Sequence, residues 1–109
     1  MKNAWVETDD EALAEVVIDR IKLVYDPEIP LNVYDLGLIY RVDISNGGVA
    51  ITMTLTNPGC PSGSEIAGAV QRVVEDIPEV KSTTVRVTFD PPYSPEMMSE
   101  AARLELGLL

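Results

Sequence analysis

The chain has 109 residues, a length typical of one domain with its own core, and we predict a single domain over residues 1–109. It carries 18 acidic and 8 basic residues, a net charge of −10, and the basic residues are scattered along the chain. This balance argues against nucleic-acid binding, which needs basic residues gathered on one face. No apolar run approaches ~20 residues, so we expect no membrane-spanning helix.

The counts of cysteine and histidine limit the chemistry further. The chain has one cysteine and no histidine. An intrachain disulfide is therefore excluded, which fits a reducing cytoplasm, and the first residues lack the apolar region of a secretory signal. We expect a cytoplasmic protein. The absence of histidine removes both the commonest general base and the commonest metal ligand.

Hydrophobic spacing predicts three helices and three strands in the order α-β-β-α-β-α. The first helix follows a capping box at residues 8–11 and ends near Tyr25, because Pro27 disfavours helical geometry before it. The other helices are expected to start at two further capping sequences, residues 62–65 and 94–96. The alternation of apolar and polar residues predicts strands over residues 38–44, 49–56 and 84–90.

These elements favour an α+β fold: a two-layer sandwich in which helices cover mainly one face of a small, mixed, three-stranded sheet. Asn46-Gly47-Gly48 joins the first two strands as an antiparallel hairpin. The helix between the second and third strands makes those two parallel, with a right-handed crossover. In the second strand, Thr52, Thr54 and Thr56 are expected on the polar face, which leads to the loop that follows.

That loop, residues 56–64, contains Cys60 between prolines and glycines, at a turn from a strand into a helix. The helix dipole at such a turn favours the thiolate, which is the form that attacks electrophiles or binds metal. Without histidine a cysteine–histidine enzyme is excluded. Three interpretations stay open: a carboxylate-assisted thiol enzyme of unknown substrate, a structural cysteine, and a metal ligand.

The metal interpretation requires help from outside the chain. Zinc and iron–sulfur sites generally have four protein ligands, and one thiolate cannot hold either stably. A homodimer would supply two Cys60 thiolates, and a partner or a small thiol the remaining ligands. A cluster bound in this way would be labile, which suits a carrier or transfer factor better than a redox enzyme.

Carboxylates are the other candidate ligands. Asp26, Glu28, Asp35 and Asp90 flank predicted element ends, and paired carboxylates can transfer protons or bind hard cations. Their spacing alone does not decide whether they converge near Cys60. Neither glycine-rich nucleotide motif is present, and the glycines that follow Asn57 could bind an anion but lack the lysine of a phosphate loop.

Four motifs, taken together, resemble the SufT/PaaD-type family of iron–sulfur cluster assembly proteins, over roughly residues 12–107. They are Asp26-Pro27-Glu28-Ile29-Pro30, Asp35-Leu36-Gly37-Leu38-Ile39-Tyr40, Met53-Thr54-Leu55-Thr56 with Pro58-Gly59-Cys60-Pro61, and Asp90-Pro91-Pro92-Tyr93 followed by Met98-Ser99-Glu100. The phenylacetate-degradation branch of the family carries an added cysteine-rich C-terminal segment. This chain ends at Leu109 without one, so the SufT-like branch is favoured.

The resemblance implies an accessory factor in iron–sulfur cluster assembly, or in cluster transfer to client proteins, with no established catalytic turnover. It places the family's cysteine on Cys60, its acidic residues on Asp26, Glu28 and Asp35, and its threonine on Thr56. The candidate cofactor-binding residues are therefore Cys60, Asp26, Glu28, Thr56 and Asn57, with Cys60 as the metal ligand. Expected partners are iron–sulfur assembly proteins and apo client proteins. The alternative is an adaptor that docks clients through its sheet edge or polar sheet face.

Overall fold

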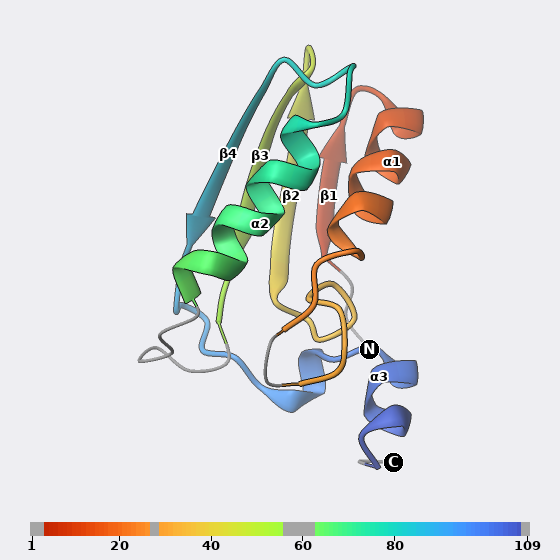
Figure 1. Cartoon of the computed structure of the whole chain (residues 1–109), viewed down its shortest axis with the longest axis vertical. Coiled ribbons are helices and arrows are strands. Elements are labelled where there is room, and N and C mark those ends of the chain that lie inside the picture. Colours follow the sequence, from red (N-terminus) through yellow and green to blue (C-terminus); the bar gives the residue numbers. More distant parts are fainter. Residues whose placement is uncertain (1–3, 27–28, 56–62, 108–109) are drawn as a thin grey trace.

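The computed structural model describes residues 4–26, 29–55 and 63–107. Four strands and three helices follow each other along these residues, with one 3-10 turn before the last helix (Figure 1). Their bounds are β1 Trp5–Thr8, α1 Glu11–Ile21, β2 Ile39–Ser45, β3 Gly48–Met53, α2 Gly63–Glu75, β4 Ser82–Val87, η1 Pro95–Met97 and α3 Glu100–Glu105. None of the helices in these ranges is long and apolar enough to cross a membrane.

The sheet has the strand order β1-β2-β3-β4 and is mixed. The predicted antiparallel hairpin of β2 and β3 is confirmed, and so is the parallel pairing of β3 with β4 across α2. Helices α1 and α2 lie on the same face of the sheet (Figure 1), so the expected two-layer α+β arrangement is confirmed. The opposite face of the sheet carries no helix in this view.

The prediction of three strands is wrong, because β1 adds a fourth strand at the edge, parallel to β2. This strand has only four residues, too few to show a period of their own. It is held by its register with β2, in which Trp5 lies opposite Arg41 and Thr8 opposite Ile44. The partner strand is more than thirty residues away in sequence, so local patterning does not reveal β1.

The presence of β1 also moves the start of the first helix. Thr8 belongs to the strand, and Asp10 caps α1 by accepting a hydrogen bond from the backbone N–H of Leu13 at 3.1 Å. The Thr8 hydroxyl instead binds the backbone of Asp10, as donor and as acceptor, at 2.9 Å. The predicted cap at Thr8 is therefore wrong by two residues.

Two predicted strand ends are also corrected. β3 ends at Met53, since the N–H of Thr54 donates to the carbonyl of Leu38, which precedes β2. β4 ends at Val87, three residues before the predicted end at residue 90, and Phe89 beyond it is 43% exposed. The register of β2 shifts between Ile39 and Arg41, which breaks the simple alternation expected there.

The core lies between the sheet and the two long helices. Buried side chains from α1, β2, β3 and α2 form one cluster that also includes residues of the loop before β2 and of the C-terminal segment; its fully buried members include Val17, Ile21, Val33, Leu36, Leu38, Val42, Met53, Val70 and Val74. The loop residues in this list show that the segment between α1 and β2 is part of the core.

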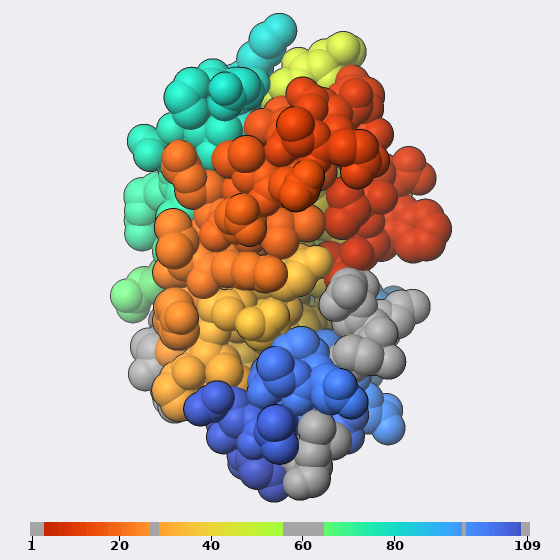
Figure 2. All heavy atoms as spheres, turned by 90° about the vertical axis from the view of Figure 1, so that its right-hand side faces the viewer, coloured from red at the N-terminus to blue at the C-terminus, as the bar shows by residue number. Residues whose placement is uncertain are grey.

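The C-terminal segment closes one end of the molecule (Figures 1 and 2). The predicted helix start at residues 94–96 is wrong: a 3-10 turn forms there, and Ser99 caps α3 by accepting from the N–H of Ala102. The N–H of Ser99 donates to the carbonyl of Asp35 at 2.8 Å, which ties this segment to the loop before β2. Gly37 allows the close approach, because a Cβ there would collide with the backbone of Met97.

Candidate functional site

Asp26 organises a compact turn after α1. Its carboxylate accepts a hydrogen bond from the N–H of Ile29 at 3.1 Å, and its own N–H donates to the carbonyl of Leu31. The N–H of Val33 also donates to the carbonyl of Val24, so the residues before and after this turn lie side by side. Asp26 is only 7% exposed. A carboxylate buried this far needs polar neighbours, and its burial places it inside the fold.

Asp35 has a local role in the same loop. Its carboxylate accepts from the side-chain amide of Asn32 at 2.9 Å, and its N–H donates back to the Asn32 side-chain oxygen at the same distance. Its carbonyl accepts from the N–H of Ser99. Asp35 therefore shapes the loop and anchors the C-terminal segment.

Tyr93 brings the segment after β4 against this loop. Its hydroxyl donates to the carbonyl of Leu36 at 2.6 Å. Burial raises the pKa of Tyr93 to about 12, and the neighbouring Tyr40 and the negative charge of Asp26 add to the rise. Two segments that are more than sixty residues apart thus meet around Asp26. Figure 1 shows both at the same end of the sheet.

Tyr40, at the start of β2, joins Tyr93 to the end of β3. Its hydroxyl donates to the carbonyl of Pro91 at 2.8 Å and lies 3.4 Å from the sulfur of Met97. Burial raises the pKa of Tyr40, and the side chain of Thr54 partly opposes this rise. Tyr40 is therefore close to Thr54.

Thr54 is fully buried, and its hydroxyl has no hydrogen-bond partner within the described part of the chain. It is close enough to influence the Tyr40 phenol, but the two groups do not meet the geometry of a hydrogen bond. A buried hydroxyl without a partner costs about 1–3 kcal/mol, so such groups are rare unless they serve a purpose. The loop that contains Cys60 begins two residues later, at Thr56.

The position of Thr54 corrects the sequence analysis. We expected it on an exposed threonine face, whereas it lies among buried residues at the end of β3. Sequence reasoning also assigned no role to Tyr40 or Tyr93, although both stand at the ends of the motifs that carried the family resemblance. Their positions in those motifs are the feature of the sequence that could have indicated a role.

The remaining predicted site residues divide into two groups. Glu28, Thr56, Asn57 and Cys60 lie outside the described residues. Asp90 is exposed, and its N–H donates to the hydroxyl of Thr88 at 3.2 Å, so it belongs to a surface turn. Within the ranges that the structure describes, no three histidine, cysteine, aspartate or glutamate residues gather as a metal site.

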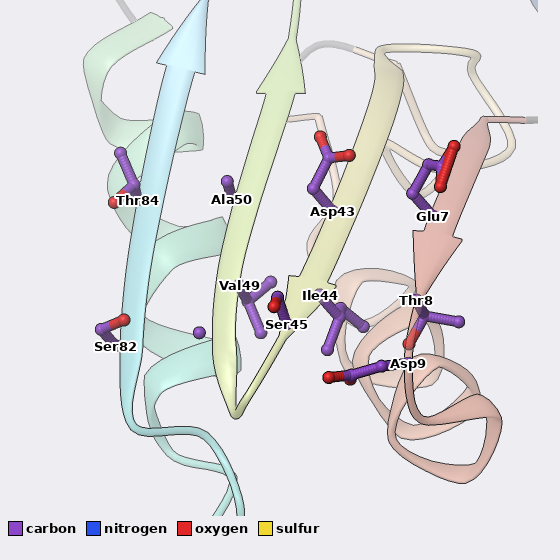
Figure 3. A pocket seen from close by; sticks show the side chains of 11 residues that line it. Glu7, Thr8, Asp9, Asp43, Ile44, Ser45, Val49, Ala50, Ser82 and Thr84 are labelled. Atoms are coloured by element: carbon purple, nitrogen blue, oxygen red, sulfur yellow. The ribbon is translucent and has the colours of Figure 1, made fainter.

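The uncovered face of the sheet forms a second candidate surface, a shallow saddle of about 580 Å³ (Figure 3). It has three carboxylates: Glu7 from β1, Asp9 from the turn after β1 and Asp43 from β2. Small residues such as Ala50 form its floor. Asp43 accepts from Arg41 at 2.7 Å. Asp9 accepts from the N–H of Asn46 at 3.0 Å. Two of the three acids thus have partners of their own.

Comparisons with known proteins identify the family of the chain. Residues 14–87 match the model of a family described as iron–sulfur cluster assembly protein. An Fe-S protein maturation auxiliary factor of Porphyromonas gingivalis is 46% identical over the whole of both chains. The Fe-S protein maturation auxiliary factor SufT of Staphylococcus aureus is 40% identical over 79% of this chain and 99% of its own length.

The fold agrees with these similarities. A crystal structure from Bacillus anthracis, described as a domain of unknown function, superimposes with a TM-score of 0.83 at 37% identity. It covers 91% of this chain and 95% of its own. The matched family segment runs from α1 to the end of β4 and includes Asp26, Tyr40 and Thr54. The chain therefore belongs to the iron–sulfur cluster assembly protein family.

Proposed function

We propose that this chain is an accessory factor in the assembly of iron–sulfur clusters, or in their transfer to client proteins, and that it acts through Cys60. The observation that carries the proposal is its similarity, over its full length, to a protein named as an Fe-S protein maturation auxiliary factor. The geometry supports a location: buried Asp26 and the hydroxyl of Thr54, which has no partner among the described residues, lie at one end of the sheet, and Thr54 precedes the Cys60 loop in the sequence.

In this proposal the cluster is cargo. The chain offers one thiolate and no imidazole, whereas a stably held cluster generally has four protein ligands. The missing ligands would come from a second copy of the chain, through its own Cys60, or from an assembly protein or apo client. A site completed in this way releases its cluster when the second protein leaves, which suits transfer. A cytoplasmic location and a homodimer are parts of the same proposal.

Thr54 would support the cluster-bearing thiolate from the described part of the site, and Asp26 belongs to the proposed cofactor-binding set. A hydroxyl donor beside a thiolate or sulfide stabilises its negative charge, and Thr54 has such a donor free of other hydrogen bonds among the described residues. Glu28, Thr56 and Asn57 complete the proposed set from the same two loops. Tyr40 and Tyr93 would hold the segment after β4 against β2 and the loop before it, because their hydroxyls donate to the carbonyls of Pro91 and Leu36.

Anaerobic reconstitution with iron and sulfide tests the proposal, with visible absorption as the readout. We expect the unmodified chain to gain the charge-transfer bands of an iron–sulfur cluster and Cys60→Ser to gain none. Ser62→Ala is the matched control, since it changes the same loop without removing the thiol. Sedimentation of the same samples shows whether the cluster brings two chains together. Equal absorption for Cys60→Ser and the unmodified chain would refute the ligand role of Cys60.

The alternative is an adaptor that docks client proteins while Cys60 is structural, and the uncovered sheet face favours it. The two functions separate in cells that lack the native gene. If Cys60→Ser restores the activity of iron–sulfur client enzymes as well as the unmodified chain does, the adaptor function is correct. A thiol enzyme would instead require Cys60 to react with iodoacetamide well below the ordinary thiol pKa of about 8.5.

A further inference from the structure

A groove of about 610 Å³ lies beside the start of β1, apart from the saddle on the sheet. Its walls come from three parts of the chain: β1 with the residue before it, the loop and first residues of β2, and the segment after β4. The rings of Trp5, Tyr34 and Tyr40 line it, together with the side chain of Met97. Tyr40 thus belongs both to this groove and to the buried cluster at the end of β3.

The side chains of the groove are those that dominate the centres of protein interfaces. Tryptophan, tyrosine and methionine are enriched there, because each buries a large area with little loss of side-chain freedom. Trp5 is 60% exposed, which is unusual for the largest apolar side chain. It is also the only tryptophan of the chain. An exposed ring beside two others favours a surface that a partner covers.

The adjoining strand can pair with an extended segment. Among the described residues, β1 stands at the edge of the sheet and pairs with β2 on one side only. Its other side therefore offers backbone N–H and carbonyl groups along Trp5–Thr8 to a further strand. Trp5 would then lie next to the side chains of that strand.

The charges around the groove indicate which type of side chain would bind there. Among the described residues that line it, Glu96 is the only charged one. The carboxylate of Asp35 is close enough to Tyr34 to raise the pKa of this phenol, in addition to the effect of burial. Aromatic faces attract cations, and Lys22 already lies 5.3 Å from the centre of the Tyr34 ring. Within a chain of net charge −10, this groove suits a basic side chain.

We propose that the groove binds an extended segment of a partner protein that carries an arginine or lysine between apolar side chains. The apolar side chains contact Trp5, Tyr40 and Met97, and the basic side chain pairs with Glu96. This inference rests on the proposed function, in which the partner is a client or an assembly protein. Through Tyr40 the segment would lie one side chain away from Thr54, which stands six positions before Cys60 in the sequence.

Titration with a synthetic peptide tests the groove directly. The probe is an acetylated, amidated pentapeptide of sequence Leu-Arg-Leu-Arg-Leu, followed by the emission of Trp5 and by calorimetry. We expect saturable binding with a Kd below about 1 mM and a blue shift of the emission, because the ring leaves water. A peptide with glutamate in place of arginine should bind at least about tenfold more weakly. Absence of binding, or equal binding of the acidic peptide, overturns the proposal.

Matched variants locate the binding. Trp5→Ser and Glu96→Gln should weaken binding, about tenfold and about threefold, as measured by calorimetry. Leu104→Ser and Glu100→Gln are their controls: Leu104 is 66% exposed, Glu100 is an exposed acid, and both lie outside the groove. The controls should bind as the unmodified chain does. Equal losses in the controls would place the binding elsewhere and overturn the proposal.

Two further variants distinguish docking in the groove from the cluster-ligand role of Cys60 and from occupation of the groove by the beginning of this chain. Cys60→Ser should bind the peptide with unchanged affinity, so a failure of docking differs from a failure of the cluster-ligand role. Removal of residues 1–3 tests the other occupant, the beginning of this chain itself. If this removal alone shifts the emission of Trp5 to the red and strengthens peptide binding more than tenfold, the groove belongs to the chain's own N-terminus and the proposal is wrong.

Discussion

The two ends of the sheet differ in how their polar groups are satisfied. At the hairpin end, near residues 45–48, two of the three acids of the saddle have partners: Asp43 accepts from Arg41, and Asp9 accepts from the N–H of Asn46. Floor residues such as Ala50 are small, and the surface is open to water (Figure 3). At the opposite end, Asp26, Tyr93, Tyr40 and Thr54 come from four separate segments and are buried or half-buried.

The two ends differ most in the burial of their acids, since Asp26 is buried and the acids of the saddle are not. The hairpin end also depends on contacts between distant residues, such as the bond from the N–H of Asn46 to Asp9, and it too holds a buried hydroxyl, that of Thr83, without a partner among the described residues. The other end holds the buried carboxylate of Asp26, which accepts a hydrogen bond from the N–H of Ile29, and the buried hydroxyl of Thr54, which has no partner among the described residues. Burial of such groups lowers the free energy of unfolding, so a role in a site explains them better than a structural role does.

Gly37→Ala should have the largest effect on stability. Gly37 has a φ of +85°, and a Cβ there would collide with the carbonyl carbon and oxygen of Met97. Because backbone on both sides must move, we expect a loss of about 3 kcal/mol in the free energy of unfolding, measured with urea. The C-terminal segment should detach from the loop, and reconstitution of the cluster should fall with it.

Two other glycines sharpen this prediction. Gly47 has a φ of +80° at the hairpin end, where a Cβ would first meet the flexible side chain of Lys81, and Gly107 has a φ of +75° in open space. Gly47→Ala and Gly107→Ala should each cost only the backbone strain, about 1 kcal/mol. If Gly37→Ala is no worse than these two, the packing of the C-terminal segment against the loop does not stabilise this end.

Tyr93→Phe should have the next largest effect, and the effect should depend on pH. At neutral pH the variant leaves the carbonyl of Leu36 without its hydrogen bond, which costs about 1 kcal/mol. The pKa of Tyr93 in the folded protein is raised from 10.0 to about 12, so the folded state holds this proton more tightly than the unfolded state. The stabilisation is complete below pH 10 and is lost as the pH rises through about 12.

The measurement is urea unfolding of both proteins at neutral pH and at a pH between these two pKa values. The difference between them should shrink as the pH rises, because only the unmodified chain carries the tyrosine. Asp26→Asn should lower the pKa of Tyr93, seen as phenolate absorbance, since it removes the negative charge nearby. Asp90→Asn, at an exposed position, is the control. A pKa of Tyr93 that stays the same in Asp26→Asn would contradict the proximity of the two groups.

The same comparison explains what the sequence could predict. The hairpin, α1, α2 and the parallel pair β3 and β4 were predictable because their signals are local: glycine turns, helical periodicity and strand alternation. Asn46, with a φ of 50°, and Gly47 adopt the backbone conformations that their residue types indicated. The edge strand β1 was missed because four residues have no periodicity and depend on a distant partner.

At the end of the sheet near Asp26, the sequence indicated the residue types of the site but not their positions in space. The motifs contained Asp26 and Thr54, but the alternation of Thr52, Thr54 and Thr56 indicated an exposed face. β3 ends at Met53 and the chain leaves the sheet there, so Thr54 is buried against the pattern. Likewise, the meeting of Tyr93 with Leu36 spans 57 positions of sequence, and no spacing rule reports such a contact.

Thr54→Val should have a smaller effect of opposite sign. Valine has nearly the same shape, and it removes a buried hydroxyl that has no partner among the described residues, so unfolding should require up to about 1 kcal/mol more. Reconstitution of the cluster should fall at the same time. Thr52→Val, at a partly exposed position two residues earlier, is the control and should change neither the stability nor the reconstitution of the cluster. A loss of stability in Thr54→Val would mean that the hydroxyl is paired in solution.

Arg41→Gln should have the smallest effect, although it removes the shortest ion pair among the described residues, 2.7 Å from Arg41 to Asp43. The hydrogen bond to Asp43 raises the pKa of Arg41, but the guanidinium is exposed to water, which screens the attraction. Urea unfolding and cluster reconstitution of the variant should both match the unmodified chain. A clear loss of reconstitution with unchanged stability would move part of the function to the sheet face, because only a partner that docks there would detect the missing charge.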